Sequence, residues 1–269
     1  MTPKFNGKNK MTNDLLVTLV QTDLFWENPE KNKDSLQRKL AALTEQTDLI
    51  LLPEMFTSGF SMNAQKLAEE PAGPALEWMQ KTAAALSVNI MGSWIVNSGG
   101  KYYNRLYSVS PDGSFSFYDK RHLFRMAGED KVFSNDNKIL TVEINGWKVR
   151  PLICYDLRFP VWSRCRKNDY DLLVYLANWP KRRIGHWKIL LQARAVENQA
   201  YAAGVNRIGN DDNGIEYPGC SMIFDPLGLT AADLRSREEI KTVRLSRAAL
   251  DSFRSKFPVW KDADDFEIK

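Results

Sequence analysis

The chain has 269 residues, of which 43% are hydrophobic, so it can bury a substantial core and most simply forms a single domain. Its 37 Lys and Arg residues exceed its 33 Asp and Glu residues by four, and the positive charges are scattered, which argues against a nucleic-acid-binding protein. The three cysteines form no C-x-x-C pair, so the sequence predicts neither a disulfide framework nor a structural zinc site, and a reducing, cytoplasmic location is expected.

The amino end, from Met1 to Lys10, is polar and rich in lysine, without the apolar core of a secretory signal. Because the first hydrophobic segment begins at Leu15, we expect residues 1–12 to be a disordered extension and residues 13–269 to form the domain. The sequence leaves open whether Met1 or Met11 is the native start. No apolar run approaches membrane-spanning length, so no membrane interaction is predicted.

Strand-like and helical segments alternate through the first part of the chain. Apolar runs predict strands over residues 15–21, 48–53 and 89–96, and apolar positions at helical spacing predict helices over residues 32–43 and 74–86. Successive strands that are separated by a helix pair in parallel, so the centre of the sheet is expected to be parallel.

Shorter strands joined by turn sequences come next. Pro111-Asp112-Gly113 and Asn145-Gly146 predict antiparallel hairpins over residues 102–120 and 140–154. The alternation then resumes, with strands predicted over residues 171–177, 200–205 and 219–225, a helix over residues 184–198, and a terminal extension over residues 261–269. This order favours an α/β protein, with a mixed sheet or a pair of sheets covered by helices and with active groups beyond the strand ends.

Three of the predicted strands are followed by a side chain that can take part in catalysis: Glu54, Lys120 and Cys154. A thiol is mostly protonated at neutral pH and needs a base or a nearby cation to become a nucleophile. Glu54, after the apolar residues 50–53, can be that base. Lys120 can favour the thiolate and then, with the backbone N–H of Tyr155, hold the oxyanion of a tetrahedral intermediate.

Each of these residues also has a simpler interpretation. A cysteine in an apolar strand is commonly inert core, and we interpret Cys165 and Cys220 in that way. A glutamate at a strand end is commonly solvated, and a lysine there commonly lies at the surface. A papain-like pairing of Cys154 with His122 or His186 is an alternative catalytic arrangement.

The segments around these three residues resemble the catalytic motifs of the nitrilase superfamily of carbon–nitrogen hydrolases. The matching segments are Leu52-Pro53-Glu54-Met55-Phe56, Tyr118-Asp119-Lys120-Arg121-His122-Leu123 and Ile153-Cys154-Tyr155-Asp156-Leu157-Arg158-Phe159-Pro160. Their order and spacing match as well, and the resemblance extends from about Leu15 to about Pro226.

The resemblance implies a four-layer αββα sandwich with a Glu54–Lys120–Cys154 triad and with no metal or organic cofactor. A second glutamate of the family maps onto Glu129, in Gly128-Glu129-Asp130, where it orders the lysine and the substrate. Members of the family pair through the helix after the cysteine motif, so a homodimer is expected. The implied reaction is hydrolysis of a small amide through a thioester on Cys154.

Within the superfamily, residues 154–160 are most similar to the omega-amidase branch, whose substrates are ω-amides of 2-oxo dicarboxylates. Arg158 then becomes the residue that binds the substrate carboxylate, because a guanidinium matches a carboxylate with two parallel hydrogen bonds. An internal ion pair with Asp156 is the alternative role for Arg158. Further candidates for the pocket wall are Phe60, Asn178 and Trp179.

Two other functions remain open at this stage. The branch that cleaves deaminated glutathione is the nearest alternative substrate class. The fold could also serve as a noncatalytic, metabolite-binding dimer, because a fold does not guarantee activity. The complete set of Glu54, Lys120 and Cys154 favours an enzyme over the binding module.

Overall fold

Two six-stranded sheets form the centre of the computed structural model, which describes residues 13–268; the predicted extension over residues 1–12 lies outside the described residues. In the order of their pairing, the first sheet contains β14 (Glu239–Leu245), β1 (Leu15–Gln21), β2 (Leu49–Leu51), β3 (Asn89–Ser98), β4 (Lys101–Val109) and β5 (Phe115–Asp119). The second contains β13 (Thr230–Asp233), β12 (Met222–Phe224), β9 (Tyr201–Asn206), β8 (Leu172–Ala177), β7 (Trp147–Ile153) and β6 (Val142–Ile144). A small third sheet pairs β10 (Ile208–Asn210) with β11 (Glu216–Pro218).

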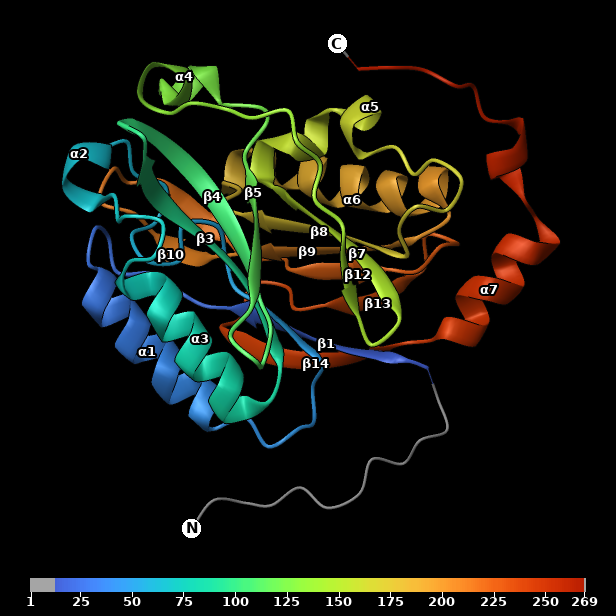
Figure 1. Ribbon diagram of the computed structural model, residues 1–269, viewed down its shortest axis with the longest axis horizontal. Helices are drawn as coiled ribbons and strands as arrows, with labels where there is room; N and C mark the ends of the chain where they lie inside the picture. The colour runs from blue at the N-terminus through green and yellow to red at the C-terminus, as the bar shows by residue number, and fades with distance from the viewer. Residues whose placement is uncertain (1–12, 269) are drawn as a thin grey trace.

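Helices cover the outer faces of the two large sheets (Figure 1). Pro29 and Pro74, which suit the first turn of a helix, open α1 (Pro29–Ala41) and α3 (Pro74–Leu86), and these helices pack together against the first sheet. The second sheet is covered by α6 (Ile184–Asn198), with the short α5 (Pro160–Ser163) beside it. The layers therefore run helix, sheet, sheet, helix, and the predicted αββα sandwich is confirmed.

The apolar residues of the first sheet alternate between two cores because successive side chains of a strand point to opposite faces. Leu15, Val17 and Leu19 of β1 belong to the cluster between the two sheets, which also contains the buried residues of β7, β8 and β9. Val20 of β1 and Ile50 of β2 belong instead to the cluster beneath α1 and α3. Two cores built in this way hold the strand ends in fixed positions.

The strand pairing agrees with the predicted order of elements. β1, β2 and β3 pair in parallel, and so do β7, β8 and β9. The two predicted hairpins are the antiparallel pairs β4–β5 and β6–β7. The parallel strands place their carboxyl ends, and the side chains that follow them, at one edge of each sheet.

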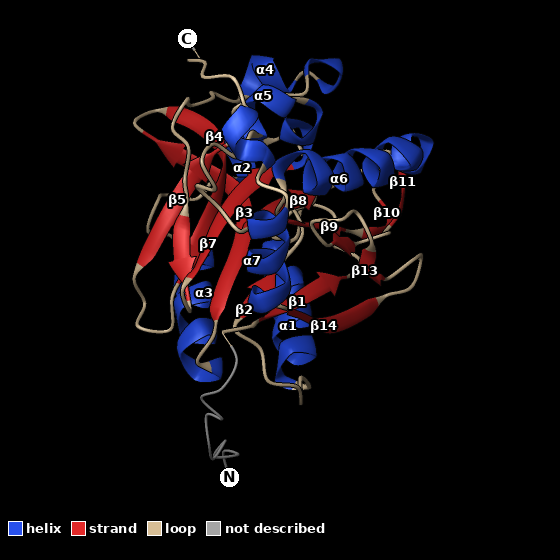
Figure 2. Ribbon diagram, turned by 90° about the vertical axis from the view of Figure 1, so that its right-hand side faces the viewer, coloured by secondary structure: helices blue, strands red, loops and turns tan. Residues whose placement is uncertain are grey.

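Several elements after residue 226 had no counterpart in the sequence prediction. β14 pairs antiparallel with β1, and α7 (Arg247–Lys256) lies at the outer side of the molecule, where it faces the viewer in Figure 2. Arg254 of α7 binds Asp171, at the start of β8, with Nη1 2.8 Å from Oδ1. The carboxyl-terminal part of the chain therefore completes the first sheet and braces the second.

The remaining elements of residues 13–268 are short. They are α2 (Ala64–Leu67), α4 (Glu129–Val132) and four 3₁₀ helices, which are Arg125–Ala127, Cys154–Arg158, Lys181–Arg183 and Val259–Asp262. Most of these lie in the loops beyond the carboxyl ends of the strands, where sequence periodicity is too short to predict them.

Candidate active site

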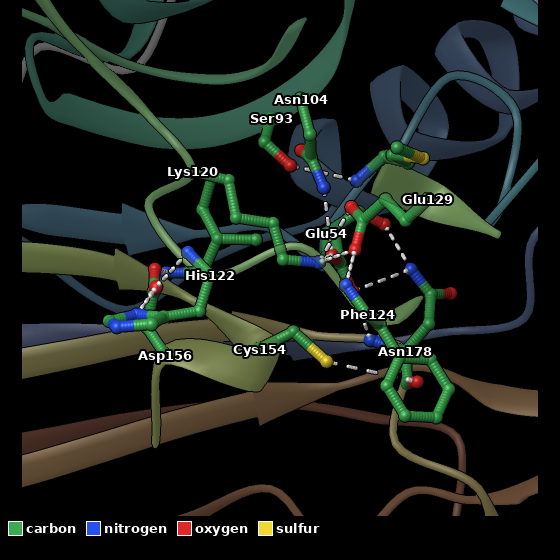
Figure 3. Close-up of polar contacts among 12 residues, drawn as sticks. Glu54, Ser93, Asn104, Lys120, His122, Phe124, Glu129, Cys154, Asp156 and Asn178 are labelled. Atoms are coloured by element: carbon green, nitrogen blue, oxygen red, sulfur yellow. Dashed lines mark hydrogen bonds and ion pairs between the residues drawn. The ribbon is translucent and has the colours of Figure 1, made fainter. Parts of the chain in front are cut away.

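Glu54, Lys120 and Cys154 come together between the two sheets (Figure 3). Glu54 follows β2 and Lys120 follows β5, both in the first sheet, whereas Cys154 follows β7 of the second. Lys120 Nζ lies 2.9 Å from Glu54 Oε1, and the charges of both residues act on the pKa of Cys154. The convergence that the sequence predicts is therefore present.

The carboxylate of Glu54 is fully buried and is held by donors on both of its oxygens. Oε1 accepts hydrogen bonds from Lys120 Nζ and from Asn104 Nδ2, at 2.9 and 2.8 Å. Oε2 accepts one from the backbone N–H of Asn178, at 2.9 Å. Asn178 also donates from Nδ2 to the backbone oxygen of Glu54, at 2.7 Å, so it fixes the glutamate from the second sheet.

Lys120 lies between two carboxylates, and all three side chains are fully buried. Its Nζ is 2.8 and 3.0 Å from the two oxygens of Glu129, the first residue of α4, and Glu129 Oε2 also accepts a hydrogen bond from the backbone N–H of Phe124 at 2.6 Å. Burial opposes the charge of Lys120, but Glu129 and Glu54 outweigh it, so the pKa of Lys120 is raised. Burial raises the pKa of Glu129.

The ammonium group of Lys120 can still donate one hydrogen bond beyond those to Glu54 and Glu129. An ammonium group has three N–H donors. One reaches Glu54 and a second can be shared by the two close oxygens of Glu129. The third is then available to an oxygen of a molecule bound beside Cys154.

Cys154 has an unusual backbone conformation at the end of β7. Its φ of 42° lies in the left-handed region, which a residue with a side chain rarely adopts and which is commonly found at functional sites. Burial and the negative charge of Glu54 raise the pKa of Cys154 well above its ordinary value, although Lys120 acts in the opposite direction. The thiol therefore holds its proton at neutral pH, and attack by sulfur requires a base that removes it.

Asp156 fixes the turn that carries Cys154. Its two oxygens accept hydrogen bonds from the backbone N–H groups of Ile153 and His122, both at 3.0 Å, and from the Tyr118 hydroxyl at 2.8 Å. His122 Nδ1 lies 2.7 Å from the same carboxylate. This buried residue links the cysteine turn to the segment of Lys120, a positioning role that the sequence did not reveal.

The alternative roles considered for the histidines and for Arg158 do not match the observed contacts. His122 contacts Asp156, and His186 Nδ1 lies 3.1 Å from Arg158 Nη2. Within residues 13–268, no hydrogen bond joins either histidine to Cys154, and no ion pair joins Arg158 to Asp156. The geometry favours Glu54 over a histidine as the base.

A cavity of about 520 Å³ opens beside Cys154 and Lys120. Every residue that the sequence predicted to bind the substrate lines it: Phe60, Tyr155, Arg158, Asn178 and Trp179. Phe124 and Arg183 also line it, although the sequence prediction did not include them. Their only sequence signal is position, because they lie in the loops that follow the Lys120 and Asn178 strand ends.

No metal site or membrane-spanning helix is found in the part of the chain that the structure describes. Among residues 13–268, no three His, Cys, Asp or Glu side chains are grouped so that they could bind a metal ion. In the same range, no helix combines the length and hydrophobicity that crossing a bilayer would need.

Comparisons with known proteins assign the chain to the family whose catalytic motifs its sequence resembles. A family model described as carbon-nitrogen hydrolase matches residues 16–255. The chain is 46% identical over 258 residues to Omega-amidase YafV of Escherichia coli strain K12, covering 94% of this chain and 98% of that protein. It is 34% identical over 251 residues to 2-oxoglutaramate amidase of Bacillus subtilis strain 168, covering 91% and 96%.

A solved structure is similar over almost the whole chain. XC1258 from Xanthomonas campestris, described as a CN-hydrolase superfamily protein with an arsenic adduct in the active site, superposes with a TM-score of 0.93. It is 42% identical, and the match covers 95% of this chain and 99% of that one. The similarity thus includes β14 and α7, beyond the range over which the sequence motifs had suggested it.

Proposed function

The protein belongs to the carbon–nitrogen hydrolase family and is an amidase, and from this premise we propose that it is an omega-amidase. The proposed substrates are short monoamides of dicarboxylic acids, and α-ketoglutaramate is the first to test because relatives are named omega-amidase and 2-oxoglutaramate amidase. The observation that carries the proposal is Arg158, a half-buried guanidinium in the wall of the same cavity as Cys154 and Lys120. A carboxylate at one end of the substrate can bind this cation while the amide at the other end reaches the thiol.

The proposed reaction has two steps, in which Glu54, Lys120 and Cys154 have separate roles. Glu54 removes the thiol proton as the sulfur attacks the amide carbon, which agrees with a thiol that is protonated before the reaction. The resulting oxyanion is held by Lys120 Nζ and the backbone N–H of Tyr155. Glu54 then protonates the nitrogen, the C–N bond breaks, and ammonia leaves a thioester on Cys154.

Water completes the cycle. Glu54 removes a proton from a water molecule that attacks the thioester carbon, the C–S bond breaks, and the sulfur regains a proton as the carboxylic acid product leaves. Glu129 takes no proton in this scheme. It holds Lys120 from the side opposite Glu54, so that one ammonium donor points to the reacting oxygen.

Ammonia release from a panel of amides tests the function. We expect turnover of α-ketoglutaramate, glutaramate and succinamate, and slower turnover of deaminated glutathione, the substrate of the alternative branch. Faster turnover of deaminated glutathione would assign the protein to that branch. No release from any amide by folded protein would favour the noncatalytic metabolite-binding dimer.

Replacement of Arg158 by lysine tests its proposed role. Lysine keeps the positive charge but cannot reproduce the planar pair of donors, so kcat/KM for glutaramate should fall about 10-fold. A neutral amide such as 5-methylhexanamide, whose isopropyl end has the shape of a carboxylate, should lose much less. An equal loss for the two amides would give Arg158 a structural role.

The proposal includes a cytoplasmic homodimer that forms through the helices after the cysteine motif. Apolar side chains are exposed there, with 55% of Val161 on α5 and 66% and 49% of Ile189 and Val196 on α6 accessible. Large exposed apolar side chains gathered on neighbouring helices are typical of an interface. Light scattering should give the mass of two chains, and a monomer mass at micromolar concentration would contradict the dimer.

A further inference from the structure

The cavity holds a second guanidinium, Arg183, for which the reaction described above has no role. Arg183 is partly buried at the end of the 3₁₀ helix Lys181–Arg183 and lies over the Phe124 ring, with 5.0 Å from Cζ to the ring centroid. Burial and the positive charges of Arg182 and Arg158 lower the pKa of Arg183, whereas Cys154 acts in the opposite direction. Arg183 lines the same cavity as Arg158 and Cys154.

Arg158 and Arg183 are partly buried and, unlike the five buried arginines, have no carboxylate partner. Within residues 13–268, no ion pair includes Arg158 or Arg183. The two guanidiniums lie in a partly apolar cavity wall, where they are incompletely solvated and repel each other. Each of five buried arginines has an acidic partner: Arg105 with Asp119, Arg150 with Asp169, Arg194 with Glu197, Arg207 with Asp23 and Arg254 with Asp171.

The carboxylates in the cavity wall already bind other donors. Glu27 accepts from the Ser61 hydroxyl at 2.7 Å and from Asn63 Nδ2 at 3.1 Å. Asp211 accepts from the Tyr217 hydroxyl at 2.9 Å and from two backbone N–H groups of its own loop. The two arginines are therefore left to an anion that enters the cavity from outside.

Trp179 positions both arginines. Its indole Nε1–H donates to the backbone oxygen of Arg183 at 2.8 Å, and Arg158 Cζ lies 5.0 Å from the centroid of its ring. Because the contact to Arg183 uses the backbone, substitution of the Arg183 side chain leaves it intact. A change in specificity on substitution can therefore be attributed to the guanidinium.

We propose that Arg183 is a second carboxylate-binding residue, which with Arg158 forms a two-guanidinium site for the anionic end of the substrate. This inference rests on the proposed function and narrows its substrate class to amides with a carboxylate, or a 2-oxo carboxylate, at the far end. Two cations favour such groups and repel an ammonium at the same place. Glutamine and asparagine, which carry an ammonium beside the carboxylate, are therefore selected against.

Kinetics of Arg183→Gln with the matched amides glutaramate and 5-methylhexanamide test the site. We expect kcat/KM for glutaramate to fall about 10- to 100-fold, mainly through KM, because a charged hydrogen-bond pair is lost. The neutral amide should change less than about 3-fold, and Arg183→Lys should recover part of the loss. Lys181→Gln is the control, because it removes the same charge from the same 3₁₀ helix at an exposed position that does not line the cavity.

The competing explanations give different results. An equal loss for both amides would make Arg183 structural. An equal loss of glutaramate turnover in Lys181→Gln would mean that positive charge in general, rather than the Arg183 guanidinium, favours the substrate. Either result overturns the proposal. Calorimetric titration of glutaramate into Cys154→Ala protein separates this inference from the proposed function, because binding needs no turnover. If Arg183→Gln weakens the binding of glutaramate, the proposed site is supported even if no amide is cleaved. If the substitution leaves binding unaffected, or if Cys154→Ala protein binds no glutaramate at all, the proposal is overturned.

Discussion

Replacement of Cys154 by alanine should lower ammonia release by roughly 10³-fold or more, because the reaction loses the only protein atom that bonds to the substrate carbon. Cys154→Ser should be impaired to a similar degree, since Glu54 would have to remove a proton from a far less acidic hydroxyl. The fold should persist, because Cys154 lies at the cavity, only partly buried at the margin of the core, and its sulfur makes one weak contact, to the backbone oxygen of Asn178 at 4.0 Å. Ammonia release and thermal unfolding of the same preparations measure both effects.

Cys165→Ala and Cys220→Ala are the matched controls. Both side chains are 6% exposed, and burial raises the pKa of Cys165 to about 11, so it is an unreactive thiol at neutral pH. The sulfur of Cys220 lies 3.9 Å from the backbone oxygen of Pro218, and burial raises the pKa of this thiol as well. Both variants should keep most of the activity at some cost in stability. Comparable loss of activity in all three cysteine variants would defeat the assignment of Cys154 as the nucleophile.

The positions of the side chains that we propose as catalytic could be predicted because each follows an apolar strand. A buried strand must end where its sequence becomes polar, and parallel strands bring their carboxyl ends to one edge. That reasoning brings Glu54, Lys120 and Cys154 to one place, where the structure has them. Helices over residues 74–86 and 184–198 were predicted with the observed bounds, whereas the helix predicted over residues 32–43 is observed as Pro29–Ala41. Apolar periodicity over two or more turns is therefore a sufficient signal for these elements.

The rest of the site depends on contacts between segments far apart in the sequence, which local patterns do not contain. The carboxylate of Asp156 accepts hydrogen bonds from donors in both large sheets. The sequence around this acidic residue does not indicate that its side chain is fully buried. Arg183 is one of three consecutive basic residues, and only the folded loop turns it into the cavity. β14 was missed for a related reason: at the edge of a sheet, only its last residue is fully buried, so its apolar pattern is weak.

Lys120→Met should both abolish activity and destabilise the fold, by about 3–5 kcal/mol near neutral pH. The substitution preserves most of the volume but leaves Glu54 and Glu129 buried without the ammonium that lies within 3.0 Å of both. Burial already raises the pKa of Glu129 in the intact protein, and loss of Lys120 removes the main opposing influence. Chemical unfolding of the variant and the parent protein at several pH values measures the difference.

The pH dependence identifies these charges as the cause. A carboxyl whose folded-state pKa is raised above its unfolded value stabilises the fold below the unfolded pKa and loses that contribution as pH rises through the folded pKa. The deficit of Lys120→Met should therefore be small near about pH 5 and grow towards about pH 8. The double variant Lys120→Met, Glu129→Gln should regain part of the stability at the higher pH, since it removes one uncompensated charge, while remaining inactive without the ammonium. The loss in free energy of unfolding could instead be constant with pH and unchanged in the double variant. Lys120 would then stabilise the site through packing of its side-chain stem, and the electrostatic account of the triad would fail.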